Sequence, residues 1–273
     1  MTPSVAGAVA ERPVSSTTGE GWVLSVALDG GHRLTGVNLS VAERGPVQAA
    51  FHGVLFDRAE LIATLDLPAD ATDPAILLSA YERWRDETLT RLRGCFVVAI
   101  ADRSEGGAVV ARDPLGLHPL FYASNGRELV FASAPKTLFA KAGISKRPNR
   151  AALADHLCYR WPDPQETFYE GVRRVVAGSR VLVAGGQVSS ARYWNPVPDD
   201  GPMDWLGEAD LDRFSHLLDQ AVDRCLSTGP TGIFFAAAML RGSGPALTRP
   251  ASPPAGSSGS AGMGSVGGGA AGG

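Results

Sequence analysis

The feature that most constrains the fold of this chain is a continuous apolar run near its middle, Phe96–Ile100. A strand with no polar face has to be covered on both sides, so this segment is expected inside a layered domain. Around it, alternating segments predict further strands, as at residues 22–28 before a glycine turn at 29–31. Apolar residues at helical spacing over 76–84 predict a helix. Together these patterns indicate a layered α+β domain, in which helices cover packed antiparallel sheets.

The remaining elements follow from the same periodicity and from capping and turn residues. Asp73 is expected as the N-cap of the long helix, with Pro74 at its first helical position, and Asp57 as the cap of a shorter one. The expected elements are strands over 37–41, 47–56 with a break at Gly53, 108–111, 120–123, 129–132, 179–184 and 188–193, and helices over 58–65, 73–92, 151–157 and 208–226.

The composition argues against several classes of protein. The 273 residues carry 25 basic and 28 acidic side chains without a long basic run, so neither nucleic acid nor an anionic membrane is an expected partner. No stretch approaches the apolar length that spans a membrane, and no apolar segment of a signal peptide opens the sequence. The three cysteines are widely spaced and form no metal-ligand cluster, so they are expected as reduced, buried thiols of a cytoplasmic protein.

An ordered series of motifs resembles one protein family. Residues 112–122 look like the RDPLGxxPLYY signature of asparagine synthetases and other class II glutamine amidotransferases. The resemblance covers roughly residues 47–232. The other motifs stand in the family's order: 93–96 is similar to its RGmFAf, 131–136 to its FASExKaL, 167–174 to the segment before its PPGhxL hairpin, and 193–194 to its YWxP.

The resemblance implies an N-terminal-nucleophile hydrolase-like αββα sandwich of two antiparallel sheets, followed by the incomplete start of an ATP pyrophosphatase domain. Together with the composition, it divides the chain into a flexible lead-in, a glutaminase-like domain, a linker, the first helix and strand of a truncated synthetase domain, and a disordered tail rich in Gly, Ala, Ser and Pro. The boundaries expected for these segments are 1–20, 21–195, 196–207, 208–240 and 241–273.

The family's glutaminase uses the cysteine after the initiator methionine as its nucleophile and the free α-amine of that cysteine as the base. In this sequence Thr2 stands at that position, before Pro3, and the nearest cysteine, Cys95, lies in a predicted strand. The resemblance therefore implies a domain without its catalytic residue, in which Thr2 is the remaining candidate nucleophile.

Four residues are expected to form the remnant of the substrate pocket. His52-Gly53-Val54 replaces the family's Asn-Gly-Glu. Gly53 keeps the backbone donor, His52 keeps a side-chain donor, and Val54 has no charge to hold an ammonium group. Asp73 matches the aspartate that binds the α-amine of glutamine, although a helix cap is the favoured interpretation. Arg33 is the candidate for the arginine that binds the carboxylate.

Arg112, Asp113 and Gly116 belong to the signature loop. Arg112 and Asp113 are expected as a structural ion pair that holds this loop, and His118 is expected at the surface.

The family's second active site requires a Ser-Gly-Gly-x-Asp-Ser loop, whose backbone amides and hydroxyls hold pyrophosphate. Residues 230–235 resemble the strand that leads into this loop, but residues 236–240 are Ala-Ala-Ala-Met-Leu. No cofactor and no metal are therefore expected in this chain, whereas the parent enzyme would use ATP and Mg. The abrupt change leads to the hypothesis of a frameshift after Phe235.

Three interpretations of the function remain. The first is a truncated relative of asparagine synthetase with an inactive glutaminase-like domain, whose parent enzyme forms an amide at the expense of ATP. The missing cysteine favours the branch of β-lactam synthetases and lasso-peptide macrolactam cyclases. The alternatives are a non-catalytic binding or interaction module, and a non-functional frameshifted remnant. The expected partner is a synthetase domain, or a second copy bound through the exposed interface.

Overall fold

The computed structural model describes residues 10–12, 21–29, 32–140, 143–161, 163–197 and 207–226. Several expectations fall outside these residues: the candidate nucleophile Thr2, most of the linker, the segment 230–240 and the tail. Within the expected lead-in, a short strand pairs with the edge of a sheet, so that part of the lead-in has regular backbone structure.

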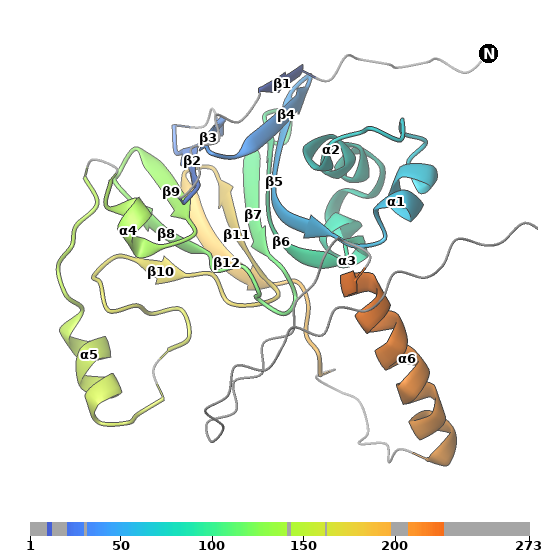
Figure 1. The fold of residues 1–273 in the computed structure, drawn as a ribbon. Coiled ribbons are helices and arrows are strands. Elements are labelled where there is room, and N and C mark those ends of the chain that lie inside the picture. The colour runs from blue at the N-terminus through green and yellow to red at the C-terminus, as the bar shows by residue number, and fades with distance from the viewer. Residues whose placement is uncertain are drawn as a thin grey trace, which may run out of the picture. The chain divides into compact units, whose positions relative to one another are not determined.

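Two antiparallel sheets form the body of the fold (Figure 1). Sheet A has seven strands in the order β1-β4-β5-β6-β7-β11-β12, and sheet B has five in the order β10-β8-β9-β2-β3. The strands are β1 (Ala10–Arg12), β2 (Val23–Ala27), β3 (Leu34–Val37), β4 (Ser40–Arg44), β5 (Val47–Leu55), β6 (Gly94–Asp102), β7 (Gly107–Arg112), β8 (Phe121–Ser124), β9 (Glu128–Ala132), β10 (Arg173–Arg174), β11 (Ser179–Ala184) and β12 (Gln187–Arg192). The helices are α1 (Arg58–Thr64), α2 (Asp73–Trp84), the 3₁₀ turn η1 (Arg85–Glu87), α3 (Thr88–Arg91), α4 (Pro135–Leu138), α5 (Arg150–Leu157) and α6 (Glu208–Leu226).

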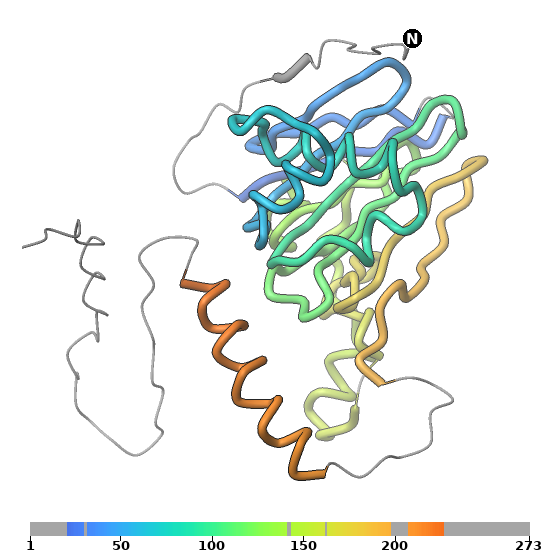
Figure 2. The backbone as a smooth tube through the Cα atoms, turned by 90° about the vertical axis from the view of Figure 1, so that its right-hand side faces the viewer, coloured from blue at the N-terminus to red at the C-terminus, as the bar shows by residue number. Residues whose placement is uncertain are grey.

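The buried apolar side chains form three hydrophobic clusters. One cluster lies between the two sheets and includes Leu24, Val97 and Phe131. A second lies between sheet A and the helices α1 to α3, and a third lies between sheet B and α4. This arrangement confirms the predicted αββα sandwich. From the side, α1, α2 and α3 lie over the β4–β6 part of sheet A and leave the β11–β12 hairpin beside them (Figure 2).

The middle of sheet A confirms the interpretation of the apolar run. Strand β6 contains Phe96–Ile100, and all five side chains are buried. The run alternates between the two cores, since Val97 and Ala99 belong to the inter-sheet cluster whereas Phe96, Val98 and Ile100 pack under the helices.

Three element predictions were wrong in detail. The single strand expected over 37–41 is two strands, because the chain reverses at Asn38, which has a φ of 56°. The break expected at Gly53 is absent, and β5 runs through it. The long helix expected over 73–92 is interrupted at Arg85, where a φ of 47° is incompatible with a continuous helix.

The cysteines also differ from expectation. Cys158 and Cys225 are exposed and Cys95 is only partly buried, so the prediction of three buried thiols was wrong. Cys158 follows the end of α5, and Cys225 lies on α6, which buries none of its side chains.

Helix α6 has the predicted bounds and a one-sided distribution of apolar residues. Its large apolar side chains are about half exposed, with Phe214 at 61% and Leu217 at 47%. Within the described ranges, no helix has both the length and the apolar character required to cross a membrane.

Candidate functional site

The structure brings three of the predicted site residues together. His52, Gly53 and Asp73 line a hollow of about 360 Å³ between the β3–β4 turn, the end of β5 and the start of α2. The remaining lining residues are Asn38, Leu39, Ser40, Phe51, Thr72 and Pro74. Backbone groups and short polar side chains therefore dominate the wall of this hollow.

Gly53 is held in a conformation that only glycine adopts readily. Its φ is 127°, and a Cβ atom there would overlap the carbonyl oxygen of Cys95 on β6. Gly94 has a φ of 152°, and a Cβ atom there would overlap the carbonyl oxygen of Val54 in the same way. The close approach expected at Gly53 is thus an approach to the neighbouring strand, and it fixes the end of β5 that carries His52.

His52 lies in a row of three rings. Its imidazole is 5.5 Å from the ring of Trp22 and 5.2 Å from the ring of His118, measured between centroids. Burial, and then the proximity of His118, lower the pKa of His52 below its usual value. At neutral pH the His52 ring is therefore uncharged, and a neutral imidazole has one donor and one acceptor nitrogen.

Trp22 and His118 are parts of this site that the sequence did not indicate. Trp22 is only 3% exposed and comes directly before β2, and its ring packs on His52. His118 is partly buried, so the expectation of a surface position was wrong. The two residues lie far from His52 in sequence, and no periodicity or spacing could have indicated their contact with it.

The chain is closely packed where it enters β2. A Cβ atom at Gly21 would lie 2.6 Å from Ser133 Oγ and 2.9 Å from Thr137 Oγ1. Both oxygens belong to side chains beside the start of β2. The next residue, Trp22, is a member of the buried inter-sheet cluster.

Asp73 has a different role from the one predicted. The N-cap of α2 is Thr72, and Asp73 is the first helical residue, so the predicted cap is shifted by one residue. The Asp73 carboxylate accepts a hydrogen bond of 3.0 Å from Arg58 Nε, and the same guanidinium donates to the carbonyl of Ala71. The negative charge of Asp73 is therefore already paired with a cation on α1.

The structure does not bring Arg33 into the hollow. Arg33 is exposed just before β3 and lies near Glu43, whose pKa is lowered by a hydrogen bond from Gln48, by Arg103 and by the charge of Arg33. Of the four predicted pocket residues, Arg33 is the one that lies elsewhere.

The signature loop is rigid, but not through the predicted ion pair. Arg112 donates to the carbonyl oxygens of His118 at 2.5 Å and Val175 at 2.9 Å, and also to that of Gly116. Gly116 has a φ of 65°, and its α-carbon faces Ala177 so closely that a Cβ atom would lie 2.8 Å away.

Asp113 is fully buried and, like Arg112, binds backbone groups. Its two carboxylate oxygens accept three backbone hydrogen bonds, from Leu115 and Leu117 at 3.1 Å and from His118 at 3.3 Å. Both charged side chains thus bind backbone groups rather than each other. The loop in turn fixes the position of His118 beside His52.

The hollow has no cluster that suggests a metal. Across the part of the chain that the structure describes, no group of three or more His, Cys, Asp or Glu side chains is placed to hold an ion. Its chemistry is that of a small polar recess with one neutral imidazole, one paired carboxylate and a backbone fixed by glycine.

Comparison with known proteins agrees with this architecture. A family model described as a glutamine amidotransferase domain matches residues 30–194. Asparagine synthetase [glutamine-hydrolyzing] 3 of Bacillus subtilis is 25% identical over 180 residues, which are 60% of this chain and 29% of that protein. A putative asparagine synthetase of Mycobacterium bovis is 30% identical over 156 residues, which are 54% of this chain and 24% of that protein.

The chain therefore matches less than a third of the length of these two relatives. Among solved structures, the glutamine phosphoribosylpyrophosphate amidotransferase of Bacillus subtilis is similar with a TM-score of 0.40 and 16% identity. That match covers 64% of this chain and 43% of the other.

Proposed function

Because the chain belongs to the glutamine amidotransferase domain family, we propose that it is a glutaminase-like domain of the asparagine-synthetase type that does not hydrolyse glutamine. The family membership rests on the match over residues 30–194 and on the relatives described above. The loss of hydrolysis is the new element of the proposal, and it rests on the site.

The observation that supports this proposal most directly is the Trp22–His52–His118 row of rings. In the family that the sequence resembles, an asparagine and a glycine donate to the oxyanion, and a free N-terminal cysteine attacks. Here the asparagine position is His52, and the indole of Trp22 is packed against that imidazole. Amide hydrolysis requires a nucleophile next to the oxyanion donors, and packed rings take up one side of this position.

The substrate-binding part of the hollow is altered as well. The family's glutamate is replaced by Val54, and the carboxylate of Asp73 is paired with Arg58 at 3.0 Å. A glutamine α-ammonium group would therefore meet one apolar residue and one carboxylate that already has a cation. Both changes disfavour the binding of glutamine in the orientation required for hydrolysis.

The test is the release of glutamate from glutamine by the purified 273-residue chain, with an active asparagine synthetase as the positive control. We expect no release above background, for the natural chain and for Thr2→Ala alike. Glutamate release that disappears in Thr2→Ala would show that Thr2 acts as the nucleophile, and the proposal would be wrong.

For the parent protein, we propose ATP-dependent amide formation, with ATP and Mg used by a second domain. The support is the similarity to asparagine synthetases together with the absence of a cysteine at position 2, which favours a macrolactam- or β-lactam-forming branch. In such an enzyme the amine is supplied by the substrate itself, so the glutaminase-like domain has no ammonia to produce. This chain is proposed to bind no cofactor, and the proposed location is the cytoplasm.

The proposed partner is a synthetase domain, or a second copy of the chain, bound through the apolar face of α6. Its support is the exposure of Leu211, Phe214 and Leu218, at 57%, 61% and 51%. A helix with this pattern normally buries its apolar face.

A second candidate function is a non-catalytic binding module. It is favoured by the hollow of about 360 Å³, which remains open beside His52. Titration of the chain with glutamine, followed by calorimetry, separates the candidates: saturable binding without hydrolysis supports the module, and no binding supports a purely structural domain.

A further inference from the structure

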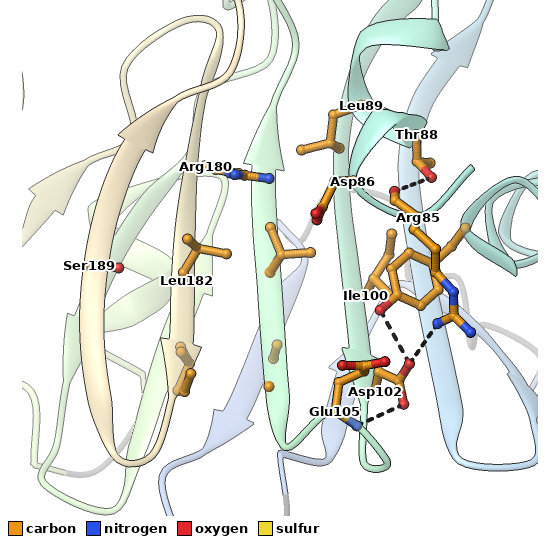
Figure 3. A pocket seen from close by; sticks show the side chains of 16 residues that line it. Arg85, Asp86, Thr88, Leu89, Ile100, Asp102, Glu105, Arg180, Leu182 and Ser189 are labelled. Carbon is orange, nitrogen blue, oxygen red and sulfur yellow. Dashed lines mark hydrogen bonds and ion pairs between the residues drawn. The ribbon is translucent and has the colours of Figure 1, made fainter. Parts of the chain in front are cut away.

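A second recess lies on the opposite face of sheet A from His52. It is bounded by the η1–α3 segment (Arg85–Arg91) on one side and by strands β6, β7, β11 and β12 beneath it (Figure 3). His52 pairs with Val97, whose side chain belongs to the inter-sheet core, whereas Ile100 in the recess belongs to the core under the helices. The imidazole of His52 and the floor of the recess therefore lie on opposite faces of sheet A.

The floor of the recess is apolar. Ile100, Val109 and Leu182 extend across three neighbouring strands, and Leu89 of α3 forms a wall. The volume is about 270 Å³, just below the usual range for small-molecule sites. Tyr81, near the end of α2, also lines the recess, beside the η1–α3 segment.

Two arginines line this recess, and the first, Arg85, is paired with Asp102. Arg180 of β11 lies next to Leu182 on the same face of the strand, and its guanidinium extends towards β7 (Figure 3). Its Nε atom is buried and has no hydrogen-bond partner among the described residues. The guanidinium therefore stands at the wall of the recess with one donor unpaired, and its positive charge favours an anionic ligand.

The acidic residues of the recess are arranged differently. Asp102 is 3% exposed, and its partners are Tyr81, Arg85 and Ser104, at 3.2, 3.1 and 2.5 Å. Because these partners already satisfy its carboxylate, Asp102 does not demand a cationic ligand. Asp86 and Glu105 also line the recess and are exposed, so they repel a negative charge that lies away from Arg180.

From this arrangement we propose that the recess binds a small monocarboxylate with an apolar body. The carboxylate accepts from the Arg180 guanidinium, and the body lies on Ile100, Val109 and Leu182. A guanidinium matches a carboxylate in geometry and charge. A neutral analogue lacks the charge-assisted bond, and a dicarboxylate places its second charge over the apolar floor and near the two acidic side chains.

The test is the affinity of the full 273-residue chain for hexanoate, hexanamide and adipate, measured by ligand-observed NMR up to about 10 mM. We expect saturable binding of hexanoate, and binding of hexanamide and adipate that is weaker by about tenfold or more, as one charge-assisted hydrogen bond implies. Equal binding of the three compounds, or no binding of hexanoate, would overturn the proposal.

Two variants locate the binding. Arg180→Met is expected to weaken hexanoate binding by about tenfold or more, whereas Arg127→Met, at an exposed arginine of the β8–β9 turn, leaves it unchanged. Leu182→Glu provides an internal carboxylate next to Arg180 and is expected to abolish binding if the chain stays folded by circular dichroism. If Arg180→Met and Arg127→Met bind hexanoate equally, or Leu182→Glu folds and still binds it, the proposed site is wrong.

Discussion

Gly53 shows how a single residue can be fixed by its neighbours on another strand. It has a φ of 127° and lies opposite Phe96, with the carbonyl of Cys95 where a Cβ atom would be. Gly53→Ala should therefore reduce the free energy of unfolding by about 3 kcal/mol or more, through strain and displacement of β6. Urea unfolding followed by circular dichroism measures this change.

The matched control is Gly106→Ala in the β6–β7 turn. Gly106 has a φ of 64°, but a Cβ atom there would meet nothing within 4 Å. Gly106→Ala should therefore reduce the free energy of unfolding by only about 1 kcal/mol, which is the cost of placing alanine in a left-handed backbone conformation. If the two variants lose equal stability, the overlap with β6 is not the decisive effect.

His52 should make the stability of the domain depend on pH. Burial and His118 lower its pKa in the folded chain, so below the usual histidine pKa of about 6.5 the unfolded chain binds more protons than the folded one. Stability should fall as the pH decreases from about 7.5 towards the lowered pKa, and level off below it. His52→Asn should reduce this loss, measured as the free energy of unfolding at several pH values.

His156→Asn is the control for that experiment, because His156 is exposed on α5. It should leave the pH dependence unchanged. A pH dependence that is the same in the natural chain and in His52→Asn would contradict the role given to His52.

At the scale of elements, the end of β7 and the chain after β12 are joined by one hydrogen bond. Tyr193 donates from its hydroxyl to the carbonyl of Arg112 at 2.7 Å, and burial together with Asp113 raises the pKa of this hydroxyl, so it stays a donor. Tyr193→Phe should cost about 1 kcal/mol of unfolding free energy. Tyr159→Phe, at a side chain that is 95% exposed, should change it by less than about 0.5 kcal/mol in the same denaturant assay.

Elements whose pattern is local were predictable, and those set by distant contacts were not. Strand β6 and helix α6 follow directly from an apolar run and from helical periodicity, and the structure has both. The interruption at Arg85 was missed because apolar residues on both sides of it keep a helical spacing. In the site, His52, Gly53 and Asp73 could be predicted from motif order, whereas the ring of Trp22 reaches His52 only through the pairing of two sheets.

At the scale of the whole molecule, the layered sandwich could be predicted because a strand buried on both faces requires cover on both sides. The signature loop illustrates the limit of that argument. Its motif indicated that Arg112 and Asp113 are structural, but they bind backbone groups that sequence alone could not place, including the carbonyl of Val175. The family resemblance located such residues in the sequence, and the structure shows which backbone groups they bind.

Helix α6 carries the remaining prediction, because its exposed apolar face should make copies of the chain associate. Phe214 and Leu218 are 61% and 51% exposed and lie one turn apart on that face. Phe214→Glu with Leu218→Glu should shift the protein towards the monomer mass, measured by light scattering over a range of concentrations. His216→Glu with Gln220→Glu makes the same spacing of charges on the polar face and should leave the mass distribution unchanged. If both double variants have the mass of the natural chain at every concentration, this face does not mediate association.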